Sequence, residues 1–174
     1  MNITELLSDK NLKSIEKRKL LVSFLANETI SIATLPQLND KQTGIVLEAM
    51  EEISQKAKGT PFINDHWLQF AEYHVSNDNN TLKREAARVI GNIAHSFPDS
   101  LDGVIPKLLQ NAENESTVIR WSSGYSLGRI IQIPKFAKSD LFEILSKISE
   151  NEQDNGVKNQ YLVGLKKANK IRNN

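Results

Sequence analysis

Cysteine is absent from the 174-residue chain, which excludes disulfides, thiolate metal sites and cysteine nucleophiles together. Glycine and proline are scarce, at 8 and 5 residues, so few positions favour tight turns or interrupt helices. No apolar run approaches the roughly 18 residues that cross a bilayer. The first residues also lack the basic and apolar regions of a secretion signal. We therefore expect one cytoplasmic domain over residues 1–174.

Neither sign of charge predominates. Lysine and arginine total 22 against 21 aspartates and glutamates, which gives a formal net charge of +1. This balance argues against a protein that coats polyanions, but it leaves room for a local basic patch. Hydrophobic residues are 39% and charged residues 25%, as in ordinary globular proteins, so wholesale disorder is not expected.

Apolar residues recur at three- and four-residue spacing over most of the chain, which predicts an all-α fold. Segments 82–93 and 119–130 align without a gap, 37 residues apart. Both read aliphatic, cation, any, any, small, small, any, any, aliphatic, glycine, any, isoleucine. A third copy begins at Val157, and a weaker one ends at Ile53. The chain therefore contains an internal repeat.

Another amphipathic segment precedes each of the three clear copies, and a short polar joint follows it. These segments are 66–75, 101–111 and 136–149, and the joints are 76–80, 113–116 and 150–155. The joints hold Asn, Asp and Ser, whose side chains accept hydrogen bonds from the first N–H groups of a helix. The repeated unit is therefore expected to be a helical hairpin of roughly 37–40 residues.

One stretch resembles the HEAT repeat closely. That family places a proline in its first helix, Asp or Asn in the joint, and Val-Arg followed by Ala-Leu-Gly in its second helix. Here Pro106, Asn114, Ile119-Arg120 and Leu127-Gly128 match that pattern. Other copies depart from it, with Lys166 where glycine is usual in the last copy, and Thr43 and Glu51 replacing the cation and the glycine upstream.

The resemblance implies an α-α superhelix, a right-handed solenoid of about four HEAT-like hairpins over residues 41–174, clearest at 79–133. Residues 1–40 fit least well and are expected to form an irregular N-terminal cap, with helices over 12–26 and 30–38. Stacked hairpins share a continuous core that one hairpin cannot form. The predicted core residues of the 82–93 helix are Leu82, Ala86, Val89, Ile90 and Ile93, and Gly91 and Gly128 are expected to allow close packing between repeats.

In HEAT proteins the second helices line the concave side, so the resemblance implies a binding stripe on those helices. We take the same solvent-facing positions of the second helix in each copy. They give an acidic end at Glu48 and Glu52, a middle of cations and aromatics, and a basic C-terminal end. The candidate partner-binding residues are Arg84, Arg88, Trp121, Tyr125, Arg129, Lys167 and Lys170. Large aromatics beside arginine are typical of binding hot spots. The alternative for Trp121 is packing against a neighbouring repeat.

Basic residues also gather near both ends. No acidic residue follows Asp154, whereas several lysines and Arg172 do, and Lys10 to Lys19 is similarly rich in cations. Such clusters can follow phosphates. They are equally consistent with the solvated capping helices that a solenoid needs.

Motifs for catalysis are lacking. The three histidines are not spaced as metal ligands, and the chain contains no HExxH, GxSxG, Walker or GxGxxG motif, so we expect neither a metal nor a cofactor. The AlkD-like DNA glycosylases are HEAT-like enzymes whose concave face combines tryptophans, basic residues and a carboxylate. In the predicted register no acid lies beside Trp121.

The expected function is therefore a non-enzymatic protein–protein interaction module, or scaffold, that binds a protein or peptide, acidic in character, on its concave face. The alternative is a nucleic-acid binder or AlkD-like glycosylase that uses the same stripe. A steep loss of affinity with salt would distinguish the alternative, because counterion release drives binding to nucleic acids.

Overall fold

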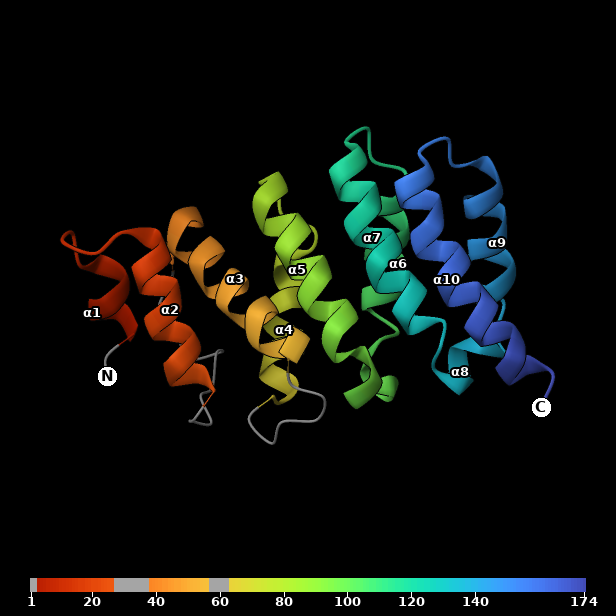
Figure 1. Cartoon of the computed structure of the whole chain (residues 1–174), viewed down its shortest axis with the longest axis horizontal. Coiled ribbons are helices and arrows are strands. Elements are labelled where there is room, and N and C mark those ends of the chain that lie inside the picture. The colour runs from red at the N-terminus through yellow and green to blue at the C-terminus, as the bar shows by residue number, and fades with distance from the viewer. Residues whose placement is uncertain (1–2, 27–37, 57–62) are drawn as a thin grey trace. The chain divides into compact units, whose positions relative to one another are not determined.

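A computed structural model describes residues 3–26, 38–56 and 63–174 of the chain. Every regular element in these ranges is a helix, which confirms the all-α class for that part of the chain. The chain forms two compact units, Met1–Val89 (unit 1) and Ile90–Asn174 (unit 2) (Figure 1). Helix α5 begins in unit 1 and ends in unit 2.

Unit 1 is built around its third helix. Its described helices are α1 (Ile3–Ser8), α2 (Ser14–Leu25), α3 (Asp40–Lys56), α4 (Asp65–His74) and most of α5 (Asn80–Ile93). Helix α3 packs against α2, and Gly44 of α3 lies against Leu82 of α5. Leu21, Leu47, Met50 and Trp67 are fully buried, so the apolar faces of these helices meet in one core.

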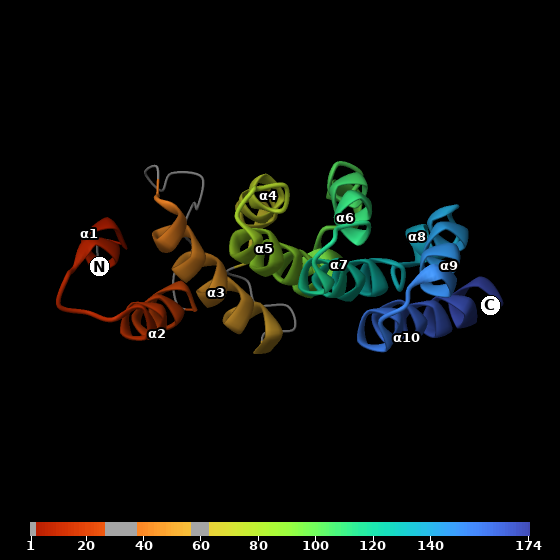
Figure 2. The same cartoon turned by 90° about the horizontal axis from the view of Figure 1, so that it is seen from above.

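Unit 2 has two layers of helices. Its α-helices, beyond the end of α5, are α6 (Val104–Ala112), α7 (Thr117–Ile130), α8 (Pro134–Ala137), α9 (Leu141–Asn151) and α10 (Asn155–Arg172), and the short 3-10 turns η2 (Ala94–Ser96) and η3 (Pro98–Ser100) precede α6. Helix α7 packs against α6 and α10, and α10 packs against α9. Figure 2 shows α6 and α9 in one layer and α7 and α10 in the other.

Glycines bring the helices of unit 2 into backbone contact. A Cβ atom added to Gly164 of α10 would lie 2.7 Å from Cα of Gly128 on α7 and closer still to its carbonyl oxygen. A Cβ atom added to Gly91 would lie 2.9 Å from Cα of Ser126, also on α7. The expected close packing at Gly91 and Gly128 is confirmed. In α10 the aligned position is occupied by Lys166, and the close approach is made instead by Gly164, two residues earlier.

The helix boundaries reproduce the repeat found in the sequence. Helices α5 and α7 both have 14 residues and begin 37 residues apart, at Asn80 and Thr117. Two of the three joints cap their helices as expected, because Asp154 accepts a hydrogen bond from Val157 N and Asn79 accepts bonds from the first turn of α5. The joint before α7 does not, because its N-cap residue Ser116 makes no side-chain capping bond. The five predicted core residues of α5 are all buried.

The described chain departs from the expected helices at α1 (Ile3–Ser8), which was not expected, and at one break. The single helix expected over 136–149 is instead two helices, α8 and α9. The hydroxyl of Ser139 donates to the carbonyl of Phe136 and accepts from Leu141 N, so a side chain replaces the helical backbone bonds at the break. The other expectation, a helix at 30–38, lies almost entirely outside the described residues, and α2 falls within the 12–26 predicted for it.

Candidate functional site

The clearest surface feature of unit 2 is a stack of three side chains on α7. The rings of Trp121 and Tyr125 are stacked, with centroids 5.4 Å apart and planes at 26°. The guanidinium carbon of Arg129 lies 3.6 Å from the centroid of the Tyr125 ring. The three residues are spaced four apart, so one face of α7 carries all of them.

Tyr125 corrects the expectation of an exposed aromatic pair. It is only 8% exposed, and its hydroxyl donates a 2.5 Å hydrogen bond to Oδ1 of Asn92 near the end of α5. Its ring therefore supports the surface from beneath, because the close approach of α5 at Gly91 covers it. Little of the Tyr125 side chain is therefore exposed at the surface.

Trp121 makes the kind of packing contact that the sequence left open as an alternative, yet it is not fully buried. It is partly exposed, and its Cδ1 would lie 3.9 Å from a Cβ atom placed on Gly156, in the first turn of α10. One edge of the indole thus packs against the neighbouring helix, while the rest of the side chain remains available at the surface. A large ring held in this way loses little conformational freedom on binding.

Arg129, the cation of this stack, has Lys167 near it, and Lys170 lies three residues further along α10. Arg129 and Lys167 lie close enough to His95 to lower its pKa, although partial burial is the larger cause of that shift. Among the described residues, no carboxylate pairs with Arg129, Lys167 or Lys170. The positive charge of the surface is therefore not neutralised internally. We call Trp121, Arg129, Lys167 and Lys170, with Tyr125 beneath them, the unit 2 patch.

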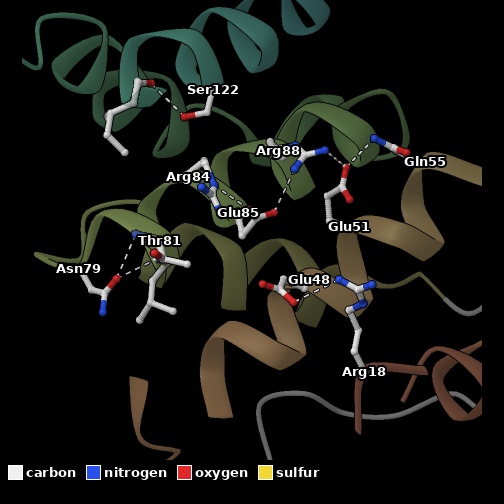
Figure 3. Close-up of polar contacts among 12 residues, drawn as sticks. Arg18, Glu48, Glu51, Gln55, Asn79, Thr81, Arg84, Glu85, Arg88 and Ser122 are labelled. Carbon is white, nitrogen blue, oxygen red and sulfur yellow. Dashed lines mark hydrogen bonds and ion pairs between the residues drawn. The ribbon is translucent and has the colours of Figure 1, made fainter. Parts of the chain in front are cut away.

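Arg84 and Arg88 belong to unit 1, where they hold buried carboxylates. Arg88 lies between Glu85 and Glu51, with Nη2 2.7 Å from Glu51 Oε1 and Nη1 3.3 Å from Glu85 Oε2 (Figure 3). Nε of Arg84 donates to Glu85 Oε1 at 2.7 Å. Gln55 Nε2 donates to Glu51 Oε1 at 2.6 Å. The two arginines thus serve first to compensate two buried negative charges.

These side chains border a recess of about 380 Å³ in unit 1. Its lining, which we call the unit 1 recess, consists of Arg18, Glu48, Glu51, Glu52, Gln55, Arg84, Glu85 and Arg88. Arg18 reaches it from α2 and pairs with Glu48 at 3.4 Å and with Glu52 at 3.7 Å. Burial raises the pKa of Glu51, and Arg88 opposes that shift.

The predicted register anticipated part of this recess and missed the rest. It placed Glu48 and Glu52 next to the cations of the middle, which include Arg84 and Arg88, and these four residues do line one hollow. It missed Arg18, Glu51 and Glu85. Two signals pointed to the glutamates: Glu51 replaces a glycine of the repeat pattern, and Glu85 stands where the next copy has Ser122, which is also fully buried.

In the described ranges no group of three metal-binding side chains comes together, and no helix is long and apolar enough to span a membrane. Asp154 lies on the same side of Gly156 as Trp121, but its carboxylate accepts from Val157 N and caps α10. An acidic side chain therefore does lie near Trp121, where the predicted register had placed none.

Comparison of the chain with protein-family models, with curated proteins and with solved structures finds no match.

Proposed function

We propose that the chain is a HEAT-like α-solenoid that acts as a non-enzymatic interaction module and binds an acidic, partly apolar segment of a partner protein through the unit 2 patch. The observation that carries this proposal is the preformed stack of Trp121, Tyr125 and Arg129, with cations near it that no described carboxylate neutralises.

The solenoid rests on the repeated helices of unit 2. The end of α5, α7 and α10 are successive second helices of the repeat, and each touches the next at a glycine. Their equal spacing along the chain, at 37 and 38 residues, is typical of stacked hairpins. Second helices that lie side by side present their matching positions on one surface, which is where the patch residues lie.

The chemistry of the patch favours an acidic partner. Arg129, Lys167 and Lys170 attract carboxylates over several ångströms and so raise the rate of association. Trp121 supplies the large contact area that dominates binding energy at interfaces. A segment that carries acidic side chains beside one leucine or phenylalanine would satisfy both parts. Desolvation of the indole by an apolar side chain contributes affinity that the lysines alone cannot give.

The test is a fluorescence anisotropy titration with a labelled peptide that alternates glutamate with leucine and phenylalanine. The same peptide with lysine in place of glutamate is the charge control, and a single-stranded oligonucleotide represents the nucleic-acid alternative. We expect the acidic peptide to bind and its lysine counterpart to fail. Trp121→Ala should weaken binding roughly thirtyfold, as expected of a hot spot worth about 2 kcal/mol.

Two variants complete the design. Arg129→Gln should weaken binding, whereas Lys147→Gln, which removes an exposed cation on α9, should leave it unchanged. Thermal unfolding of each variant separates loss of binding from loss of folding. Tighter binding of the oligonucleotide than of the peptide, with affinity that falls steeply as salt rises, would replace this proposal by the nucleic-acid alternative.

A further inference from the structure

The unit 1 recess is lined by arginines whose N–H donors are not all used by the described residues. Each guanidinium carries five N–H donors, and three arginines line the recess. The carboxylates of Glu51 and Glu85 are buried, at 8% and 3% exposed, and already accept bonds from Arg88 and its neighbours. The unused capacity of the recess therefore lies on its arginines.

Arg84 carries the most unused capacity in a fixed orientation. Its Nε is bound to Glu85 Oε1 at 2.7 Å, and that carboxylate is held in turn by Arg88. In the described part of the chain, Nη1 and Nη2 of Arg84 have no partner, and the side chain is 36% exposed. The Nε bond orients the planar group, so its two terminal nitrogens present the fork that matches a carboxylate.

The charge of the recess indicates which anion fits. Lys56 pairs with Glu52 at the rim, so four cations balance the four lining glutamates. A neutral recess accepts one additional negative charge more readily than two. The four nearby carboxylates repel a phosphate dianion about twice as strongly as a single carboxylate, because the repulsion scales with the charge. Arg18 adds a second cation, which its long contacts to Glu48 and Glu52 hold weakly.

We propose that the unit 1 recess is a receptor for a single carboxylate, which Nη1 and Nη2 of Arg84 bind end-on with Arg18 as a second cation. Single carboxylates occur on acidic side chains and at the C-terminus of a peptide. This site lies wholly within unit 1, so it stands or falls independently of the function proposed for the unit 2 patch.

The experiment follows the side-chain Nε–H resonances of arginine by NMR while small probes are added. N-acetylglycine represents a chain end, and N-acetylglutamic acid amide represents an acidic side chain. N-acetylglycinamide has the shape of the first probe without its charge. Both carboxylates should shift the Arg84 resonance to saturation, and the tighter of the two identifies the natural source. N-acetylglycinamide should leave the resonance unmoved.

Substitutions then test the fork. Arg84→Lys keeps a positive charge beside Glu85 and should fold, but it loses the planar pair of donors. We expect its affinity for the better probe to fall at least about tenfold, as for the loss of a hydrogen bond to a charged group. Arg84→Gln should bind no more tightly than Arg84→Lys. Arg172→Gln, which removes an arginine of unit 2, is the matched control and should bind like the unaltered chain.

Three results would overturn this site: no saturable shift with either carboxylate, equal affinity in Arg84→Lys and the unaltered chain, or tighter binding of inorganic phosphate or lysinamide than of the carboxylates. Because Arg84→Lys retains the ion pair with Glu85, a folding defect in Arg84→Gln does not prevent the test.

Discussion

A single methyl group on Gly164 should separate α10 from α7. The Cβ atom of an alanine at this position would lie 2.7 Å from Cα and 2.8 Å from the carbonyl carbon of Gly128, and nearer still to its oxygen. All three are backbone atoms of α7, so no side chain can rotate away to make room. The two helices can accommodate alanine only by moving apart along their contact.

The expected loss follows from two opposing effects. Overpacking a well-packed contact costs roughly 1–3 kcal/mol, and a backbone contact belongs at the upper end of that range. Alanine returns about 1 kcal/mol through its higher helix propensity. Gly164→Ala should therefore reduce the free energy of unfolding by about 2 kcal/mol, which lowers Tm by about 4–8 °C for a chain of this size.

Urea unfolding followed by circular dichroism measures this loss, and Gly44→Ala is the matched control. A Cβ atom on Gly44 would lie 3.6 Å from Leu82 Cδ2, which is an ordinary contact. Only the helix propensity then changes, so Gly44→Ala should stabilise the chain by up to about 1 kcal/mol. Equal stability of Gly164→Ala and the unaltered chain would refute the backbone contact between α7 and α10.

Three further predictions concern the buried carboxylates. Glu85→Ala leaves two arginines of unit 1 without their shared partner and should lower the free energy of unfolding in urea by about 3 kcal/mol. This is the low end for a buried pair, because the arginines are partly exposed. A loss below about 1 kcal/mol would contradict the role of Glu85 as their shared partner. The hydrogen bond from Arg120 lowers the pKa of Glu152. This carboxylate therefore adds stability above pH 4.5, which is lost as the pH falls through the lowered pKa. In unfolding curves recorded at a series of pH values, Glu152→Gln should remove this acid-dependent loss. The pH dependence expected of Glu51 is the reverse, because burial raises its pKa. The stability of the unaltered chain relative to Glu51→Gln should therefore fall as the pH rises above 4.5. A stability difference that increases with pH would contradict the raised pKa.

The sequence predicted the helices and the glycine contacts because both follow from local pattern. Leu82 and Ile119 occupy the same place in two aligned segments, and each is 1% exposed on a helix that begins two residues before it. Gly91 and Gly128 stand at one register position, where their helix-propensity cost already indicated close packing. The periodicity that gives an amphipathic helix was sufficient for these features.

The candidate sites were less accessible to this reasoning. The spacing of Trp121 and Tyr125 placed them on one helix face, but only tertiary packing of α5 against α7 decides that Tyr125 is covered. Glu51 stands where two other copies have glycine, and Glu85 stands where one copy has Ser122. A buried charge at these positions depends on arginines from other positions and helices. Helical periodicity does not encode such long-range pairing.

Indole N–H resonances test the function proposed for the chain most directly, because the sequence contains only two tryptophans and they lie in different units. Trp121 is partly exposed in the unit 2 patch, whereas Trp67 is 1% exposed in the core of unit 1. At saturation with the acidic peptide, the Trp121 indole resonance should shift and that of Trp67 should stay in place. A saturated complex in which the Trp121 resonance has not moved would contradict the unit 2 patch as the binding surface.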